Sequence, residues 1–204
     1  MAIGMYRGVN NVARKVTKMY RGVSNVARKI TKGYRGVSNV ARKFFSSETY
    51  LYNAGDKCTS VSGGWTFVSY ISSDYSASNT SITYNSNNMV LHAWYSGGKG
   101  DCSIYTQKKI DLSKYRYLCA KVSATGSGVD LADVNFLVFN NLPTASSKPT
   151  WHKGENLRPY SSTAVVRMDI SNINTTSSIG FWAYDIVSAA PTAKITIHQV
   201  WLEE

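Results

Sequence analysis

Several features that define large classes of protein are missing from this sequence of 204 residues. No apolar run approaches the roughly 20 residues of a membrane-spanning helix, so we expect no insertion into a membrane. The first residues also lack the apolar segment of a secretory signal. We therefore expect a chain that is made in the cytoplasm and is not exported by that route.

Cysteine is scarce. The sequence contains Cys58, Cys102 and Cys119, and no two of them have the Cys-x-x-Cys spacing. An odd number of cysteines without such a pair argues against a disulfide framework and against a zinc centre. We expect three free thiols and no bound metal.

Local signatures of the common enzymes are absent as well. The sequence has no Gly-x-Ser-x-Gly, His-Glu-x-x-His, P-loop or Gly-x-Gly-x-x-Gly match. His92 and His198 fall in expected strands and are interpreted as structural, hydrogen-bonded histidines. His152 and Glu155 form only a weak acid–base pair within one expected loop. The sequence thus predicts a protein that is not an enzyme and needs no cofactor.

Paired carboxylates, which glycan-cleaving enzymes use, are not convincingly spaced. Asp130 and Asp133 are the nearest pair, and their place before an expected strand is typical of a turn or loop. Asp101, Asp111 and Asp169 are likewise interpreted as turn formers.

Acidic residues are missing from the first 45 positions, which contain 11 lysines and arginines. Residues 46–204 contain the remaining 12 basic residues and all 12 acidic ones, so their charges balance. The formal charge of +11 therefore belongs to the first segment. We expect two domains, a basic one over 1–45 and a neutral one over 46–204.

The basic segment contains three nearly identical copies of a 14-residue unit. The copies begin at Tyr6, Tyr20 and Tyr34 and share the pattern Tyr-Arg-Gly-Val-x-Asn-Val-Ala-Arg-Lys. The cations recur at the same places in each copy, which favours contact with a nucleic acid, an anionic cell-surface polymer or an acidic partner protein. The residues expected to make this contact are Arg7, Arg14, Lys15, Arg21, Arg28, Lys29, Arg35, Arg42 and Lys43.

Two structures fit the repeats. As a β-hairpin, each copy turns at a pair such as Ser24-Asn25 and places Arg21 opposite Arg28, which is unfavourable without an acidic neighbour. As a trimeric coiled coil, the copies provide an apolar seam from Val9 to Phe44 with alternating spacings of three and four residues. We favour hairpins because four glycines and weak helix formers oppose the helix. Either form buries little alone, so we expect self-association, most simply a homotrimer, or docking on a larger assembly.

The repeats resemble tandem Tyr-x-Gly-Val-x-x-Val-Ala-Arg-Lys units of tail and minor structural proteins of tailed bacteriophages and prophages. The resemblance covers residues 5–45 and continues more loosely through residues 50–58 and 63–65. It implies a virion component, made in the host cytoplasm, that contacts other virion proteins. It carries no catalytic residue over to this sequence.

The neutral domain has the sequence pattern expected of an all-β sandwich. Short alternating runs are separated by Gly, Ser and Asn, and no long helix is indicated. Ile110-Asp-Leu-Ser and Met168-Asp-Ile-Ser resemble a pattern of carbohydrate-binding-module-like sandwiches and viral fibre heads, which implies a jelly-roll-like fold. The expected strands are 65–71, 81–84, 89–94, 103–106, 117–122, 134–139, 164–168, 179–184 and 194–202.

A sandwich of this kind binds sugars by stacking exposed aromatic rings on them. Trp65, Trp94, Trp182 and Trp201 lie in strand-like runs and are expected in the core, and Tyr70, Tyr75 and Tyr95 are weaker candidates. The candidate ligand-binding residues lie in the loop between Pro149 and Pro159 and just after it: Trp151, His152, Asn156, Arg158 and Tyr160.

The combined prediction is a phage tail-fibre or receptor-binding type of protein that attaches without covalent chemistry to a host surface glycan. A capsid decoration or head-fibre protein, and a nucleic-acid-binding protein acting through the repeats, remain alternatives.

Overall fold

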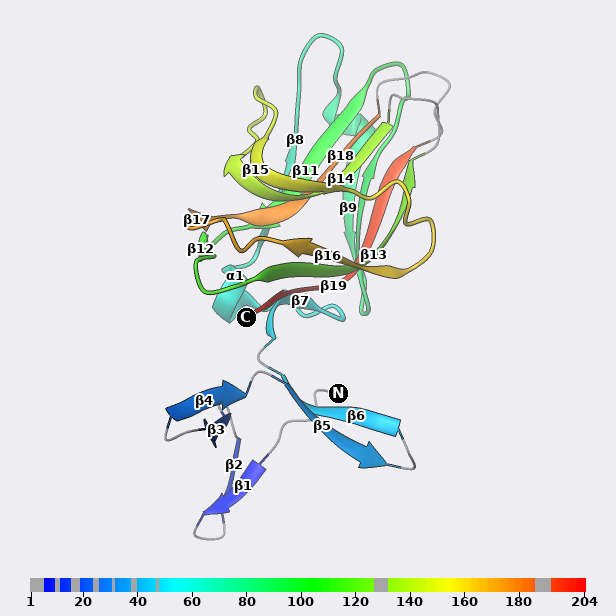
Figure 1. Ribbon diagram of the computed structural model, residues 1–204. Helices are drawn as coiled ribbons and strands as arrows, with labels where there is room; N and C mark the ends of the chain where they lie inside the picture. The colour runs from blue at the N-terminus through cyan, green and yellow to red at the C-terminus, as the bar shows by residue number, and fades with distance from the viewer. Residues whose placement is uncertain are drawn as a thin grey trace. The chain divides into compact units, whose positions relative to one another are not determined.

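The structure is a computed structural model that describes residues 6–9, 12–15, 19–23, 26–30, 32–37, 40–46, 48–126, 132–185 and 192–204. The chain divides into two compact units, Met1–Thr49 and Tyr50–Glu203 (Figure 1). No helix among the described residues is long and apolar enough to cross a membrane.

The described backbone of the repeats runs in three antiparallel strand pairs. In the second copy Tyr20 lies opposite Lys29, and Arg21 lies opposite Arg28. The connection at Ser24 and Asn25 lies outside the described residues, so the choice between hairpins and a coiled coil stays a prediction. The pairs are β1 (Tyr6–Val9) with β2 (Val12–Lys15), β3 (Met19–Val23) with β4 (Val26–Ile30), and β5 (Lys32–Val37) with β6 (Val40–Ser46).

The second unit is a β-sandwich of two sheets (Figure 1). One sheet has the order β16 (Ala164–Asp169), β13 (Tyr117–Gly126), β19 (Ala193–Glu203), β10 (Met89–Ala93) and β9 (Thr80–Tyr84), with β7 (Thr49–Asn53) beside β19. The other has the order β15 (Thr150–Asn156), β14 (Ala132–Asn141), β18 (Ile179–Asp185), β11 (Gly100–Thr106) and β8 (Trp65–Ser69). The remaining elements are α1 (Thr59–Ser62), the 3-10 turn η1 (Ala77–Asn79), and the paired short strands β12 (Ile110–Asp111) and β17 (Thr176–Ser177).

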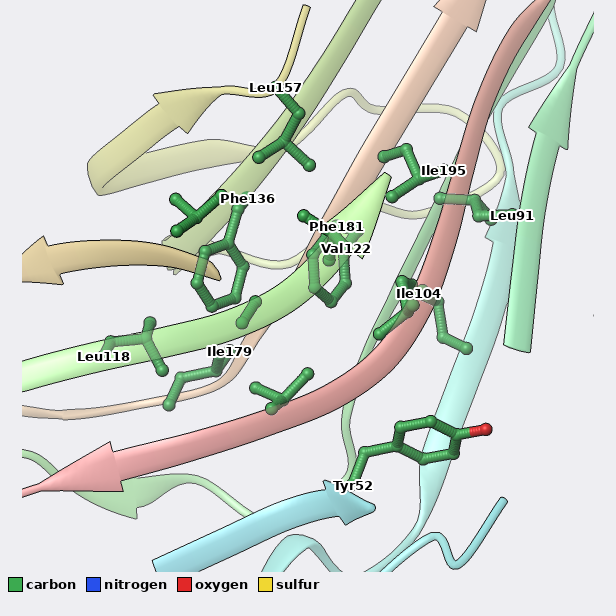
Figure 2. Close-up of a cluster of buried hydrophobic side chains, with 14 of the residues drawn as sticks. Tyr52, Leu91, Ile104, Leu118, Val122, Phe136, Leu157, Ile179, Phe181 and Ile195 are labelled. Carbon is green, nitrogen blue, oxygen red and sulfur yellow. The ribbon is translucent and has the colours of Figure 1, made fainter. Parts of the chain in front are cut away.

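The core lies between the sheets because alternate side chains of each strand point to one face. Leu91, Val122 and Ile195 come from the first sheet and meet Phe136 and Phe181 of the second (Figure 2). The two phenylalanine rings stack with centroids 4.7 Å apart. Each such side chain, fully buried, contributes about 1.5–3 kcal/mol to folding, so this interface holds the sandwich together.

All nine expected strands are confirmed, with ends shifted by a few residues, and so is the β-sandwich. The jelly-roll description is finer than this and stays a prediction. Asp111 and Asp169 are confirmed as turn formers, since their carboxylates accept the backbone N–H of Ser113 and Ser171 at 3.1 and 2.9 Å. Within the described part of the chain, Cys58, Cys102 and Cys119 are not joined in a disulfide.

Three expectations are wrong. Residues 150–156, expected in a loop, form the edge strand β15. Asp101 is no turn former but a buried residue of β11, with 1% of its surface exposed. His92 was expected to be hydrogen-bonded, but its Nε2 is buried without a hydrogen-bond partner in the described part of the chain. The imidazole packs on Trp94, with ring centroids 4.7 Å apart.

Candidate functional site

The outer face of the five-stranded sheet carries a row of aromatic rings, here called the aromatic face. Along β18, Ile179, Phe181 and Ala183 belong to the main core, so the alternating residues Trp182 and Tyr184 point away from it. The neighbouring strands continue this face at matched positions. Trp182 lies between Ser103 of β11 and Asn135 of β14, and Tyr184 lies between Asp101 and Asp133.

Three rings follow one another on this face. The indoles of Trp151 and Trp182 have centroids 5.5 Å apart, and Trp182 stacks on Tyr184 at 4.7 Å with planes 20° apart. Trp182 is buried, whereas Trp151 exposes 44% of its surface. Trp151 is therefore the ring that presents a face to solvent, and Trp182 supports it.

Gly154 of β15 lies close to the side chains of Leu137 and Trp151. A Cβ atom on Gly154 would lie 2.6 Å from Cδ2 of Leu137 and 3.4 Å from Cδ1 and Nε1 of Trp151. Leu137 itself is buried in a small apolar cluster with Phe139 and Trp182, separate from the main core. The missing side chain thus leaves room for Leu137, a member of the cluster beside Trp151.

Asp101 anchors the other side of Trp182. The indole Nε1–H donates to Asp101 Oδ1 at 2.6 Å, and the Nζ of Lys148 lies 3.4 Å from Oδ2. Burial raises the pKa of Asp101, and the partners Trp182 and Lys148 oppose this rise. Oδ1 thus accepts a hydrogen bond that fixes the orientation of the indole, whereas Oδ2 has the ion pair with Lys148 and no hydrogen-bond partner among the described residues.

Lys148 extends the site at the end of the face. Its ammonium lies 4.5 Å from the ring centroid of Tyr75, 5.4 Å from Tyr184 and 5.5 Å from Tyr70, and it donates to the Tyr75 hydroxyl at 3.0 Å. Burial lowers the pKa of Lys148, but the interactions with Tyr75 and Asp101 outweigh it and the pKa is raised. Lys148 therefore stays charged and keeps donor capacity, since an ammonium has three donors.

A second polar group borders Tyr184. Asn156 donates to Asp133 Oδ1 at 3.4 Å, and the guanidinium of Arg158 lies 3.5 Å from the same oxygen. Burial, together with Asp133, raises the pKa of Tyr184 to about 12. The carboxylates Asp101 and Asp133 are thus each paired with a cation, and this part of the face carries balanced charge.

The structure brings together some of the expected ligand-binding residues and separates others. Trp151, Asn156 and Arg158 lie at the aromatic face. Tyr160 packs against the main core, and His152 is exposed on β15. The side chains of the nine basic repeat residues lie outside what the structure describes.

Sequence reasoning missed the supporting residues of the site. Trp182 is buried as expected, but in the cluster under the aromatic face rather than in the main core. Tyr184, Asp101 and Lys148 gave no separate signal, although Trp182 and Tyr184 two residues apart in a strand indicate a shared face. Trp65 and Trp201 are buried as expected, and Trp94 is only half-buried.

The site offers binding chemistry. Asp130 lies outside the described residues, and Asp133 is engaged by Asn156 and Arg158. Among the residues that the structure describes, no group of three His, Cys, Asp or Glu side chains is placed to hold a metal ion. An exposed indole flanked by amides and ammonium or guanidinium donors can stack on an apolar ring face and hydrogen-bond its substituents.

No protein-family model and no curated protein matches this sequence. Among solved structures, the chain is similar to the mannan-recognising carbohydrate-binding module TmCBM27, with 11% identity, a TM-score of 0.41, and coverage of 76% of this chain and 96% of that one. It is also similar to the enzymatically active domain of tailspike protein 4 of bacteriophage CBA120, with 14% identity and a TM-score of 0.38, covering 68% of this chain and 19% of that one. A carbohydrate-binding module specific for non-crystalline cellulose, CBM28, has 12% identity and a TM-score of 0.35, with coverage of 61% and 80%. At these identities and TM-scores the similarities say nothing about the ligand of this chain.

Proposed function

We propose that the sandwich unit, Tyr50–Glu203, is a glycan-binding module and that its ligand lies on the aromatic face. The observation that supports this most directly is the row of Trp151, Trp182 and Tyr184, whose outermost ring is 44% exposed. A large, rigid, exposed indole held from below loses little freedom when it binds, which favours recognition without induced order.

The polar groups beside the rings suit the hydroxyl groups of a sugar. Asn135 and Asn156 lie opposite each other on adjacent strands, and an amide both donates and accepts hydrogen bonds. Lys148 and Arg158 add donors at the end of the face. The role of the module is attachment without turnover, so the proposed protein is not an enzyme.

For the whole chain we propose a virion protein of a tailed phage, of the tail-fibre or receptor-binding type, attached to the particle or to other copies through the repeats. This part of the proposal rests on the repeat resemblance over residues 5–45. A decoration or head-fibre protein would have the same two units and no affinity for glycans.

The proposal is tested by replacing the exposed indole. Trp151→Ala should weaken binding to host cell-wall glycan about tenfold or more, because truncating a central aromatic contact typically removes more than 1 kcal/mol of binding free energy. Binding is measured by isothermal titration calorimetry or on a glycan array.

The matched control is Tyr84→Ala, which removes a ring of similar exposure, 40%, from β9 of the other sheet. It should leave affinity unchanged. Wild-type protein that binds no host glycan would overturn the proposal and favour the decoration role.

A second candidate function is favoured by the repeat register. Arg7 lies opposite Arg14, Arg21 opposite Arg28, and Arg35 opposite Arg42, in a segment that contains no acidic residue. Like charges directly opposite each other destabilise a strand pair, so a polyanion would stabilise each copy.

If duplex DNA is that polyanion, the full chain should bind it with an affinity that falls steeply with salt, whereas residues 46–204 should not bind. Gel shifts at several salt concentrations measure this. A shift that survives removal of residues 1–45 would contradict it.

A further inference from the structure

A polar pocket lies at the opposite end of the aromatic face from Lys148. Its volume is about 260 Å³. Phe139 and Leu142 belong both to its wall and to the apolar cluster that supports Trp182. The other residues of its lining are Lys109, Asn140, Asn141, Thr176, Ser177 and Ser178.

The pocket and the exposed indole lie on one line of the sheet. Ser178 and Trp182 are four residues apart and lie on the same side of the chain, about 13 Å apart at 3.3–3.4 Å per residue. Phe139 contacts both the pocket and the aromatic face. Its backbone N–H donates to the carbonyl of Ser178 at 3.0 Å, and its Cα is paired with that of Trp151. A short linear oligosaccharide can span this distance.

The pocket lining has a cation without an acidic neighbour in the lining, and a buried hydroxyl without a hydrogen-bond partner among the described residues. Lys109 is exposed and is the charged residue of the lining, which contains no carboxylate. The Ser178 hydroxyl is buried and has no hydrogen-bond partner among the described residues, an arrangement that costs free energy unless a partner arrives.

We propose that this pocket is a subsite for an acidic sugar residue, a hexuronate, in the glycan that the aromatic face binds. This rests on the proposed function of the module. The carboxylate pairs with the ammonium of Lys109, the ring hydroxyls take the amide of Asn140 and the hydroxyls of Ser177 and Ser178, and the apolar ring face lies toward Phe139. The aromatic face, where charges are balanced, then holds the neighbouring uncharged sugar residue of the same glycan.

The test uses the full chain, ¹⁵N-labelled, titrated with D-glucuronate, D-glucose and acetate while amide shifts are followed by NMR. D-Glucuronate should shift the amides of Asn140, Ser177 and Ser178 in a saturable way and bind at least about fivefold more tightly than D-glucose, because hydrogen bonds to charged groups are among the stronger ones. Lys109→Ala should reduce this affinity about fivefold or more. Lys109→Ala and the control variant Lys108→Ala should both fold, because the side chains of Lys109 and Lys108 are exposed.

Lys108→Ala is the matched control, since Lys108 lies outside the pocket and donates to the carbonyl of Ser60 at 3.1 Å. It removes the same charge one residue away and should leave the affinity for D-glucuronate unchanged. Equal affinity of wild type and Lys109→Ala overturns the subsite, and equal shifts with acetate overturn its assignment to a sugar. D-Glucuronate shifts confined to Trp151, Trp182 and Tyr184 would overturn the pocket and leave the aromatic face standing, whereas shifts confined to the pocket would support the subsite; the aromatic face has its own test in Trp151→Ala.

Discussion

At the scale of single residues, Asp101 shows how a buried charge can hold a binding site in place. A carboxylate that is 1% exposed is costly unless it is paired and hydrogen-bonded. Here Trp182 supplies an N–H donor at 2.6 Å and Lys148 an ammonium at 3.4 Å. These two contacts offset only part of the cost of burial, since the pKa of Asp101 is still raised, and the hydrogen bond fixes the orientation of the indole that supports Trp151.

The raised pKa of Asp101 predicts a pH dependence of stability. Because the folded protein binds this proton more tightly than the unfolded chain, Asp101 contributes most below its ordinary pKa of 3.8, and the contribution is lost as the pH rises through the folded pKa. The unfolding free energy of wild type minus that of Asp101→Asn should therefore fall between pH 3 and pH 7. Urea unfolding at several pH values measures it, and a flat or rising difference would contradict the raised pKa.

Asp111 provides a control, because the expected pH dependence of its contribution to stability has the opposite sign. Hydrogen bonds from Ser113 lower the pKa of Asp111, so the stability that this carboxylate contributes is present above the ordinary pKa and is lost as the pH falls through the folded pKa. The same difference for Asp111→Asn should rise with pH.

At the scale of elements, β15 determines the shape of the site. It is an edge strand, paired only with β14, and the pairing is irregular between Val138 and Phe139. Such a bulge breaks the simple alternation of faces. It brings both Trp151 and Gly154 to the side of Leu137, so that the exposed indole covers the apolar cluster.

Gly154→Ala should disturb this arrangement. The new methyl group would lie 2.6 Å from Cδ2 of Leu137, which must shift, and 3.4 Å from Trp151, which is an ordinary contact distance; a displaced Leu137 disturbs the cluster on which Trp151 packs. We expect a loss of about 1–3 kcal/mol in unfolding free energy, as is typical of overpacking, together with weaker glycan binding. Urea unfolding and titration calorimetry measure the two effects.

Gly98→Ala serves as the comparison, because a Cβ there would have its nearest neighbours at ordinary contact distances of 3.7–3.8 Å. It should change stability little. If Gly154→Ala were equally harmless, the close packing of Trp151 on β15 would not matter for the site.

At the scale of the whole molecule, charge is distributed between two units of different character. The segment 1–45 holds the formal charge of +11, and residues 46–204 are neutral. A segment of this length buries little on its own, so we expect other copies or a larger assembly to complete its core.

We therefore expect the full chain to be a trimer and residues 46–204 to be a monomer. Light scattering after size exclusion gives both masses. A monomeric full chain would contradict self-association and favour a segment that docks on a partner or a polyanion. A trimer of residues 46–204 would instead place the association in the sandwich.

The sequence by itself determined the class of fold, the nine central strands and the division of charge. These follow from local properties, since alternation of apolar residues, turn residues and composition act within a few positions of the chain. Trp151, Asn156 and Arg158 were singled out as candidates in the same way, because an aromatic residue among polar ones between two prolines is visible locally, and the structure places them at the aromatic face.

Only the tertiary structure decided which side chains meet. Asp101 and Trp182 are separated by 81 positions and yet share a hydrogen bond, and Lys148 reaches them from the connection before β15. Whether Trp182 supports the main core or the opposite face depends on the register of β18 against β11 and β14. Strand order and register are set by long-range pairing, which no local pattern contains, so the site emerges only when the sheet is assembled.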